Sequence, residues 1–149
     1  MPIKIANVKI AFHVHATEDE RKVLRALKNV LPPGVKITLV RDVYRGYYGN
    51  PIIRYEAFVK DSRDASKIFK FIFSNMHAFT YPDWIAERYD EREQVLYIRL
   101  DKQAAYLGEI KLGDGSDIIH FTFKFHKYCK LTARELEKHI EKLMRRGSE

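Results

Sequence analysis

Four charged side chains that could exchange protons or bind an anion lie between residues 99 and 109. They are Arg99, Asp101, Lys102 and Glu109. Such groups act as general acids or bases where a pocket displaces their pKa values. Opposite charges that are close in sequence also form salt-bridge networks around turns, and this is the interpretation we expect. No catalytic residue is therefore predicted, although a catalytic role of Asp101, Lys102 and Glu109 stays open.

Two segments contain polar and aromatic side chains that a turn does not require. A turn needs only residues such as Gly, Asn, Asp and Pro. Residues 46–51 also include Tyr47 and Tyr48, and the segment after residue 101 includes Gln103 and Tyr106. Aromatic rings stack on flat ligands, and amides both donate and accept hydrogen bonds. The two segments therefore indicate a surface that recognises a ligand.

The histidines and the cysteine do not form a recognisable metal site. His13 and His15 lie two residues apart on an expected strand, and His120 and His126 lie on the polar face of another. A zinc site needs fixed imidazoles with a further carboxylate or thiolate, and the sequence lacks the helical His-Glu-x-x-His motif. We expect polar strand histidines, with no metal and no cofactor. The single Cys129 excludes an intrachain disulfide framework.

The charge of the chain is positive and unevenly distributed. Its 149 residues carry a formal net charge of +7, and the sequence pI is about 9.4. Residues 36–70 hold eight Lys or Arg against four Asp or Glu, whereas residues 71–110 hold four against seven. A basic surface attracts phosphate backbones and other polyanions. The charge is compatible with nucleic-acid binding and also with a basic protein that binds none.

Length and composition predict a single domain over residues 1–149. The longest apolar runs are too short for a transmembrane helix, and the first residues lack the apolar core of a signal peptide. Together with the low cysteine content, these features favour the cytoplasm. Few Gln and Asn beside many Lys, Arg and Glu are typical of a thermophile protein.

Hydrophobic periodicity predicts the element order β-α-β-β-α-(α)-β-β-α. Residues 4–15 alternate as a strand. Thr17 and Glu20 then form a capping box for a helix that ends at Pro32. The other expected elements are a strand that starts with Val35, Ile37 and Leu39, strands at residues 53–59, 96–100 and 121–125, helices at 62–76, at 82–89 and after Thr132, and a helical turn at 102–107.

Antiparallel strands covered by helices on one face define a two-layer α+β sandwich, which is the predicted fold class. The other sheet face is then open or covered by a partner. Basic and aromatic groups on such a face are typical of sheet-based RNA modules, but a solvated sheet or a dimer interface explains them equally well. The residues expected there are Lys9, His13, His15, Thr38, Arg54, Glu56, Tyr97, Arg99, Thr122, Lys124 and His126.

A second candidate surface is helical. Arg63, Lys67 and Lys70 form a basic stripe on the helix expected at residues 62–76, opposite its apolar face. Such a stripe contacts nucleic-acid phosphates or is simply solvated, and both interpretations stay open.

Three motifs resemble, in the same order, those of an archaeal protein family. They are His-Ala-Thr-Glu-Asp at residues 15–19, Gly-Tyr-Tyr-Gly-Asn-Pro-Ile at 46–52 and Arg-Leu-Asp-Lys-Gln-Ala-Ala-Tyr-Leu-Gly-Glu at 99–109. The chain is similar over nearly its whole length to an archaeal family of RNA-binding domains whose members are known as predicted exosome subunits. That family usually has a His where this chain has Tyr47.

The resemblance implies an archaeal source, a fold like that of the ribosomal protein that binds 5S RNA, and association with RNA. We therefore predict a non-catalytic RNA-binding accessory protein linked to RNA processing or the exosome. Cations would bind phosphates, tyrosines would stack on bases, and amides would read base edges. The residues predicted to bind RNA are Arg45, Tyr47, Tyr48, Asn50, Arg63, Lys67, Lys70, Arg99, Lys102, Gln103 and Tyr106.

Two other functions stay open. The open sheet face could form a homodimer or join the chain to the proteins of an RNA-processing assembly. Alternatively, Asp101, Lys102 and Glu109 could form the site of a nuclease.

Overall fold

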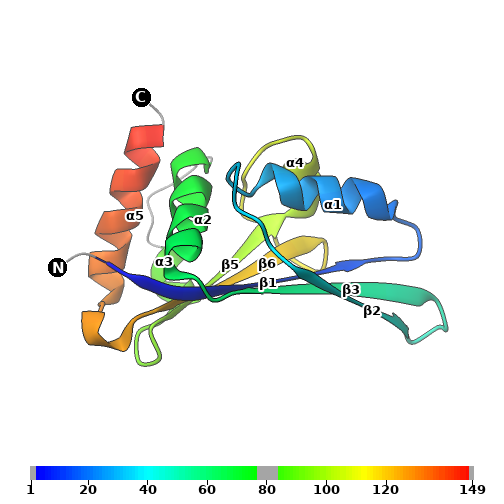
Figure 1. Ribbon diagram of the computed structural model, residues 1–149, viewed down its shortest axis with the longest axis horizontal. Coiled ribbons are helices and arrows are strands. Elements are labelled where there is room, and N and C mark those ends of the chain that lie inside the picture. The colour runs from blue at the N-terminus through cyan, green and yellow to red at the C-terminus, as the bar shows by residue number, and fades with distance from the viewer. Residues whose placement is uncertain (1–2, 77–83, 148–149) are drawn as a thin grey trace.

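Helices and strands form two layers, and the helices lie on one side of a single sheet (Figure 1). The computed structural model describes residues 3–76 and 84–147. The described helices are α1 (Glu20–Asn29), α2 (Ser62–Asn75), α3 (Ile85–Arg88), α4 (Lys102–Tyr106) and α5 (Ala133–Gly147). The strands are β1 (Ile5–Val14), β2 (Leu39–Arg45), β3 (Pro51–Val59), β4 (Tyr89–Asp90), β5 (Val95–Asp101) and β6 (Ile118–Phe125). The predicted two-layer α+β class is confirmed.

The sheet has the strand order β2-β3-β1-β6-β5-β4, and each pair of neighbouring strands is antiparallel. In the centre, Phe12 of β1 lies opposite Tyr55 of β3 and Ile119 of β6. Because side chains alternate along a strand, this register places every second residue of each strand on the same face. β2 and β4 are the two edges. Among the described residues, no helix is long and apolar enough to cross a membrane.

The core lies between the sheet and the helices, and Phe69 of α2 is buried within it. The apolar stripe of α2 is buried, as the helical periodicity predicts. The ring centroid of Phe69 lies 4.7 Å from that of Phe73, 5.2 Å from that of Phe123 and 5.8 Å from that of Phe125. It also stacks on His139 of α5, with centroids 6.1 Å apart. One side chain therefore joins α2, β6 and α5.

The start of α1 differs from the prediction. The N-cap is Asp19, whose carboxylate accepts a hydrogen bond from the backbone N–H of Arg21. Thr17 does not cap the helix, because the chain first makes a turn in which Glu18 N–H donates to the carbonyl of His15. The Glu18 carboxylate in turn accepts from His15 N–H at 2.9 Å. These local bonds delay the helix by two residues relative to a cap at Thr17.

Two strands also differ from the prediction. The strand expected to start at Val35 begins only at Leu39 and continues to Arg45, because residues 35–38 cross from the helix layer to the sheet edge. The two-residue strand β4 was not predicted, because two residues cannot display a period. Of the helix expected at residues 82–89, Ile85–Arg88 is helical, and residues 77–83 lie outside the described chain.

The remaining elements agree with the periodicity. The helical turn expected at residues 102–107 is α4, and Asp101 caps it by accepting from Ala104 N–H at 3.1 Å. Thr132 caps α5, because its hydroxyl accepts from Glu135 N–H and donates to the Glu135 carboxylate.

We expect Phe69→Ala to lower the free energy of unfolding by about 3–5 kcal/mol, because it leaves a cavity where α2, β6 and α5 meet. Urea denaturation measures this loss. The matched control is Phe58→Ala on the sheet face away from the helices, where Phe58 is 53% exposed. Equal losses in the two variants would contradict the burial of Phe69 in the core.

Candidate functional site

Cations and aromatic rings share the sheet face that the helices leave open. Lys9 of β1 lies opposite Phe58 of β3 and Thr122 of β6, and Thr122 lies opposite Tyr97 of β5. This row crosses four strands and carries a cation between partly exposed rings, because Phe58 is 53% and Tyr97 is 43% exposed. The predicted open face therefore exists. Of its expected members, His15, Thr38 and His126 lie just outside the strands.

A hollow of about 390 Å³ lies on this face beside the row and is called here the Ala11 hollow. Ala11 lies opposite Glu56 on one side and His120 on the other, and His120 lies opposite Arg99. The methyl group of Ala11 is short, so the longer neighbouring side chains surround a depression. The residues that line it are Ala11, Phe12, His13, Arg54, Arg99, Gly115, Ser116, Ile118 and His120.

Hydrogen bonds organise the side chains of the hollow. Arg54 Nη1 lies 3.2 Å from Nε2 of His13, and Arg54 also donates to the carboxylate of Glu56 at 2.6 and 2.9 Å. A guanidinium can only donate, so Nε2 of His13 is the acceptor. Oγ1 of Thr122 lies 3.4 Å from Nδ1 of His120.

The imidazoles of the hollow are held in their neutral form. Burial, followed by the positive charge of Arg54, lowers the pKa of His13 below its ordinary value. Burial, followed by the charge of Arg99, likewise lowers the pKa of His120. The hydrogen bond from Arg54 lowers the pKa of Glu56, which stays a carboxylate. The permanent positive charges among the residues that line the hollow are therefore those of Arg54 and Arg99.

A second hollow, of about 420 Å³, adjoins the first and shares Arg99 and His120 with it. Its other lining residues are Glu87, Arg88, Tyr97, Gly113 and Asp114. The ring centroid of Tyr97 lies 6.1 Å from that of His120. The two hollows make a continuous depression across β1, β6 and β5, with a guanidinium in the middle.

The tip between β2 and β3 projects beyond the helix layer (Figure 1). Gly46 N–H donates to the Asn50 carbonyl at 2.7 Å, and Gly49, whose φ is +80°, closes the turn. Tyr47 and Tyr48 are 95% and 87% exposed, and their rings meet edge to face. Four predicted residues are therefore together at this tip: Arg45, Tyr47, Tyr48 and Asn50.

Lys102 is not on the surface, which corrects its predicted role as a phosphate contact. The residue is 2% exposed. Its ammonium donates to the His13 carbonyl at 2.7 Å and to the Glu18 carboxylate at 3.0 Å, and it lies 3.4 Å from the Asp117 carboxylate. A buried ammonium with these partners joins the end of β1 to α4 and is not available to a polyanion.

The charged cluster expected between residues 99 and 109 is dispersed by the fold. Arg99 lies on the open sheet face, Asp101 caps α4, and Lys102 is buried with Glu18. Glu109 is exposed after the end of α4. The residues named for the nuclease alternative therefore share no pocket in the described chain.

The other predicted residues lie in the helix layer. Gln103 donates to the Asp117 carboxylate at 3.1 Å, and Tyr106 is half-buried beneath Lys22. Arg63, Lys67 and Lys70 are exposed on α2. These residues are separated from the open face by the sheet itself, so the predicted set does not form one surface.

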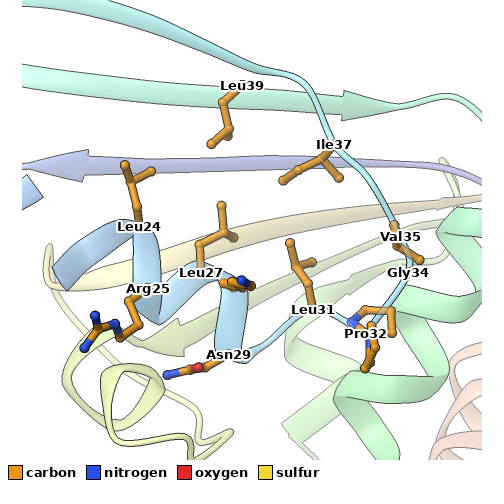
Figure 2. Close-up of a pocket in the computed structure, with 12 residues that line it drawn as sticks. Leu24, Arg25, Leu27, Asn29, Leu31, Pro32, Gly34, Val35, Ile37 and Leu39 are labelled. Atoms are coloured by element: carbon orange, nitrogen blue, oxygen red, sulfur yellow. The ribbon is translucent and has the colours of Figure 1, made fainter. Parts of the chain in front are cut away.

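An apolar groove of about 680 Å³ lies between α1 and the crossing segment before β2. Figure 2 shows Leu24, Leu27 and Leu31 turned toward Ile37 and Leu39 across this space. All of these side chains except Leu27 are only half-buried. The sequence marked them as core or strand residues, and only the course of the crossing segment shows that they line a groove.

Comparison with known proteins identifies the family. A family model described as RNA binding matches residues 7–125. This chain belongs to that RNA-binding family. The match covers the open face and the β2–β3 tip, and it ends before α5.

The proteins that are similar to this chain and are described here come from archaea. The chain is 37% identical to "RNA-binding protein PAB1135" of Pyrococcus abyssi, with 79% of this chain and 80% of that protein covered. It is 36% identical to "Uncharacterized protein MJ0213" of Methanocaldococcus jannaschii, with 90% and 93% covered. The crystal structure of protein AF2318 from Archaeglobus fulgidus matches with a TM-score of 0.74 and 30% identity, covering 94% of this chain and 99% of that one.

Only some of the residues that line the Ala11 hollow were predicted from the sequence. His13, Arg54 and Arg99 were expected on the open face, but only Arg99 was among the predicted RNA contacts. His120 was considered only among the histidines of a possible metal site, and Ala11 was not selected. The sequence signal for the hollow was a small residue, Ala11, between longer polar residues. This signal becomes informative only when the register of β1, β3 and β6 is known.

We expect Lys102→Met to lower the free energy of unfolding by about 2–4 kcal/mol, because Glu18 and the His13 carbonyl lose their buried donor. The dependence of RNA affinity on salt should stay unchanged, because Lys102 is not exposed to RNA. Urea denaturation and RNA titration measure the two quantities. Lys124→Met, at an exposed position of β6, is the matched control for stability. A stable Lys102→Met protein with a weaker salt dependence would restore Lys102 as a phosphate contact.

Proposed function

We propose that this chain binds single-stranded RNA along the open face of its sheet and at the β2–β3 tip, as an accessory protein without catalysis of its own. The observation that carries the proposal is the combination of exposed cations and aromatic rings on one uncovered face, within the segment matched by the RNA-binding family. The name of the Pyrococcus abyssi relative supports the same ligand.

Phosphate contacts in this proposal come from the open face and the tip. Lys9, Arg99 and Lys124 are exposed on the strands, and Arg45 is exposed where β2 ends. Cations spread over a surface bind the RNA backbone without reading its sequence, and they make the affinity depend on salt. The neutral imidazoles of this face add hydrogen-bond donors without adding charge.

Stacking contacts in the proposal come from aromatic rings that the fold leaves exposed. Tyr47 and Tyr48 lie at the tip, and Phe58 and Tyr97 lie on the open face. Bases in a single strand present their flat faces to such rings, whereas bases in a duplex are already stacked on each other. Single-stranded RNA is therefore the form that fits. Asn50 is exposed at the tip, and in this proposal its amide reads a base edge.

The basic stripe of α2 is a separate proposal. Lys70 is close enough to His139 that, after burial, its charge contributes to lowering the pKa of that histidine. Arg63, Lys67 and Lys70 thus face solvent beside α5, in the layer opposite the open face. One short strand of RNA cannot contact both layers at once, so we assign the primary path to the open face.

We expect the double variant Tyr47→Ala, Tyr48→Ala to weaken binding of an unstructured oligouridylate by about thirtyfold or more, because each of the two lost stacking contacts costs about 1–3 kcal/mol. The slope of log affinity against log salt should not change, since no cation is removed. Fluorescence anisotropy over a series of KCl concentrations measures both quantities, and the length of the RNA is checked in the same samples.

The double variant Lys67→Glu, Lys70→Glu provides the comparison. With the RNA on the open face, it reduces affinity less than the tyrosine variant does. A larger reduction together with a flatter salt slope would place the RNA on α2. Shortening of the RNA in the samples would contradict the non-catalytic proposal.

A second candidate function is supported by the apolar groove beside α1. Partly exposed Leu24, Leu31 and Ile37 form a surface of the kind that protein partners cover. It offers a place where this chain could join the exosome or another RNA-processing assembly, or pair with a second copy. The association with such an assembly is part of this proposal. So is a fold like that of the ribosomal protein that binds 5S RNA. Copurification of the tagged chain from its own cells, with Leu31→Asp as control, tests the association.

A further inference from the structure

We propose that the Ala11 hollow binds one phosphodiester group of the RNA backbone. The proposal deepens the proposed function and depends on it. It goes further in naming one place on the open face, one chemical group of the ligand and the side chains that hold it.

The hollow exists because a small residue occupies the middle of a row of long ones. Across the sheet the row runs Glu56, Ala11, His120 and Arg99, as the strand register fixes. In the next row, Arg54 lies opposite His13. Because only Ala11 lacks a long side chain, an anion can approach the sheet here while the surrounding side chains keep their contacts.

Arg99 is the group best placed to bind the anion. Its guanidinium lines both hollows. Within residues 3–76 and 84–147, no carboxylate forms an ion pair with it. A guanidinium has five N–H donors in a planar fork that fits two oxygens of a phosphate. Arg54, by contrast, is already bonded to Glu56 and His13 and supplies a positioned charge.

The hollow carries an excess of positive charge. Arg54 and Arg99 line it, and Lys9 lies 3.8 Å from the carboxylate of Glu56 beside it. Glu56, which also pairs with Arg54, contributes one negative charge. The two neutral imidazoles contribute none. The positive excess attracts the negative charge of a phosphodiester.

The imidazoles can still hydrogen-bond the phosphate. Nε2 of His13 accepts from Arg54, so the proton of the neutral ring is on Nδ1 and that nitrogen is a donor. The adjoining hollow continues past Arg99 to Tyr97, two residues earlier on the same face of β5. A phosphate beside Arg99 would therefore have an aromatic ring next to it for the neighbouring base.

The decisive variant is Ala11→Leu, which fills the hollow without changing any charge. We expect it to weaken binding of oligouridylate by about tenfold, because the phosphate loses its charge-assisted contacts in the hollow. The matched control is Val40→Leu, which adds bulk to an exposed position opposite Glu56 but outside the hollow, and it should bind like the wild type.

A second pair of variants removes charge in place of adding bulk. Arg99→Gln should weaken binding more than Lys124→Gln does, although each removes one exposed cation from the open face. Urea denaturation shows that each variant is folded. If Ala11→Leu does not fold, this pair decides the question.

Nuclear magnetic resonance of the imidazoles locates the ligand directly. Oligouridylate should shift the ring signals of His13 and His120 in the wild type and in Val40→Leu, but not in Ala11→Leu. Inorganic phosphate, used as a separate probe, should shift them only at much higher concentration.

The outcomes separate the two proposals. Wild-type protein that fails to bind oligouridylate at low salt overturns both the hollow and the RNA-binding function. Wild-type binding with equal affinity in Ala11→Leu and unchanged histidine signals overturns the hollow alone. Inorganic phosphate that binds more tightly than oligouridylate also overturns it, because the site would then be one for free phosphate.

Discussion

The packing of Phe69 between the sheet and α5 decides which face of the sheet is free. Once α2 is fixed on β6 through this ring, the buried alternate residues of β1, β5 and β6 are committed to the helix side. The remaining residues must then face away, and they are mainly polar, basic and aromatic ones. A strand with period two has no other arrangement, because a shift of one residue would bury the charges and expose the core. The proposed binding surface is thus a consequence of the core.

Lys102 makes a second connection on which the geometry depends. It ties the carbonyl end of β1 and the turn before α1 to the start of α4. Asn29 adds to this connection by donating from α1 to the carbonyls of Ala105 and Tyr106 in α4. These bonds therefore connect α1 and α4 to β1, the strand that carries His13 and Ala11. A buried charge of this kind is costly unless each donor has a partner, and here the partners are present.

Local sequence patterns were sufficient to predict the two layers of the fold, but they were not sufficient to predict the candidate site. Periods of two and of about 3.6 residues depend only on neighbours in the chain, so β1, β3, β5, β6, α2 and α5 were predicted correctly. The burial of Lys102 depends on Glu18, which is 84 residues away in sequence, and no local pattern contains that pairing. The cap at Asp19 was missed because Glu18 and His15 bond to each other in the preceding turn. The Ala11 hollow likewise needs three strands in register before its lining residues are neighbours.

The edge position of β2 has a consequence for association between molecules. Among the described strands, β2 pairs only with β3, so its outer backbone N–H and C=O groups face solvent over seven residues. Such an edge is a template on which another chain can add a strand and begin aggregation. In β2 the edge carries Arg41, Asp42 and Arg45, and all three are exposed. Charges at these positions oppose the growth of a continuous sheet. The β2–β3 hairpin can therefore project into solvent while strand pairing between copies of the chain is disfavoured.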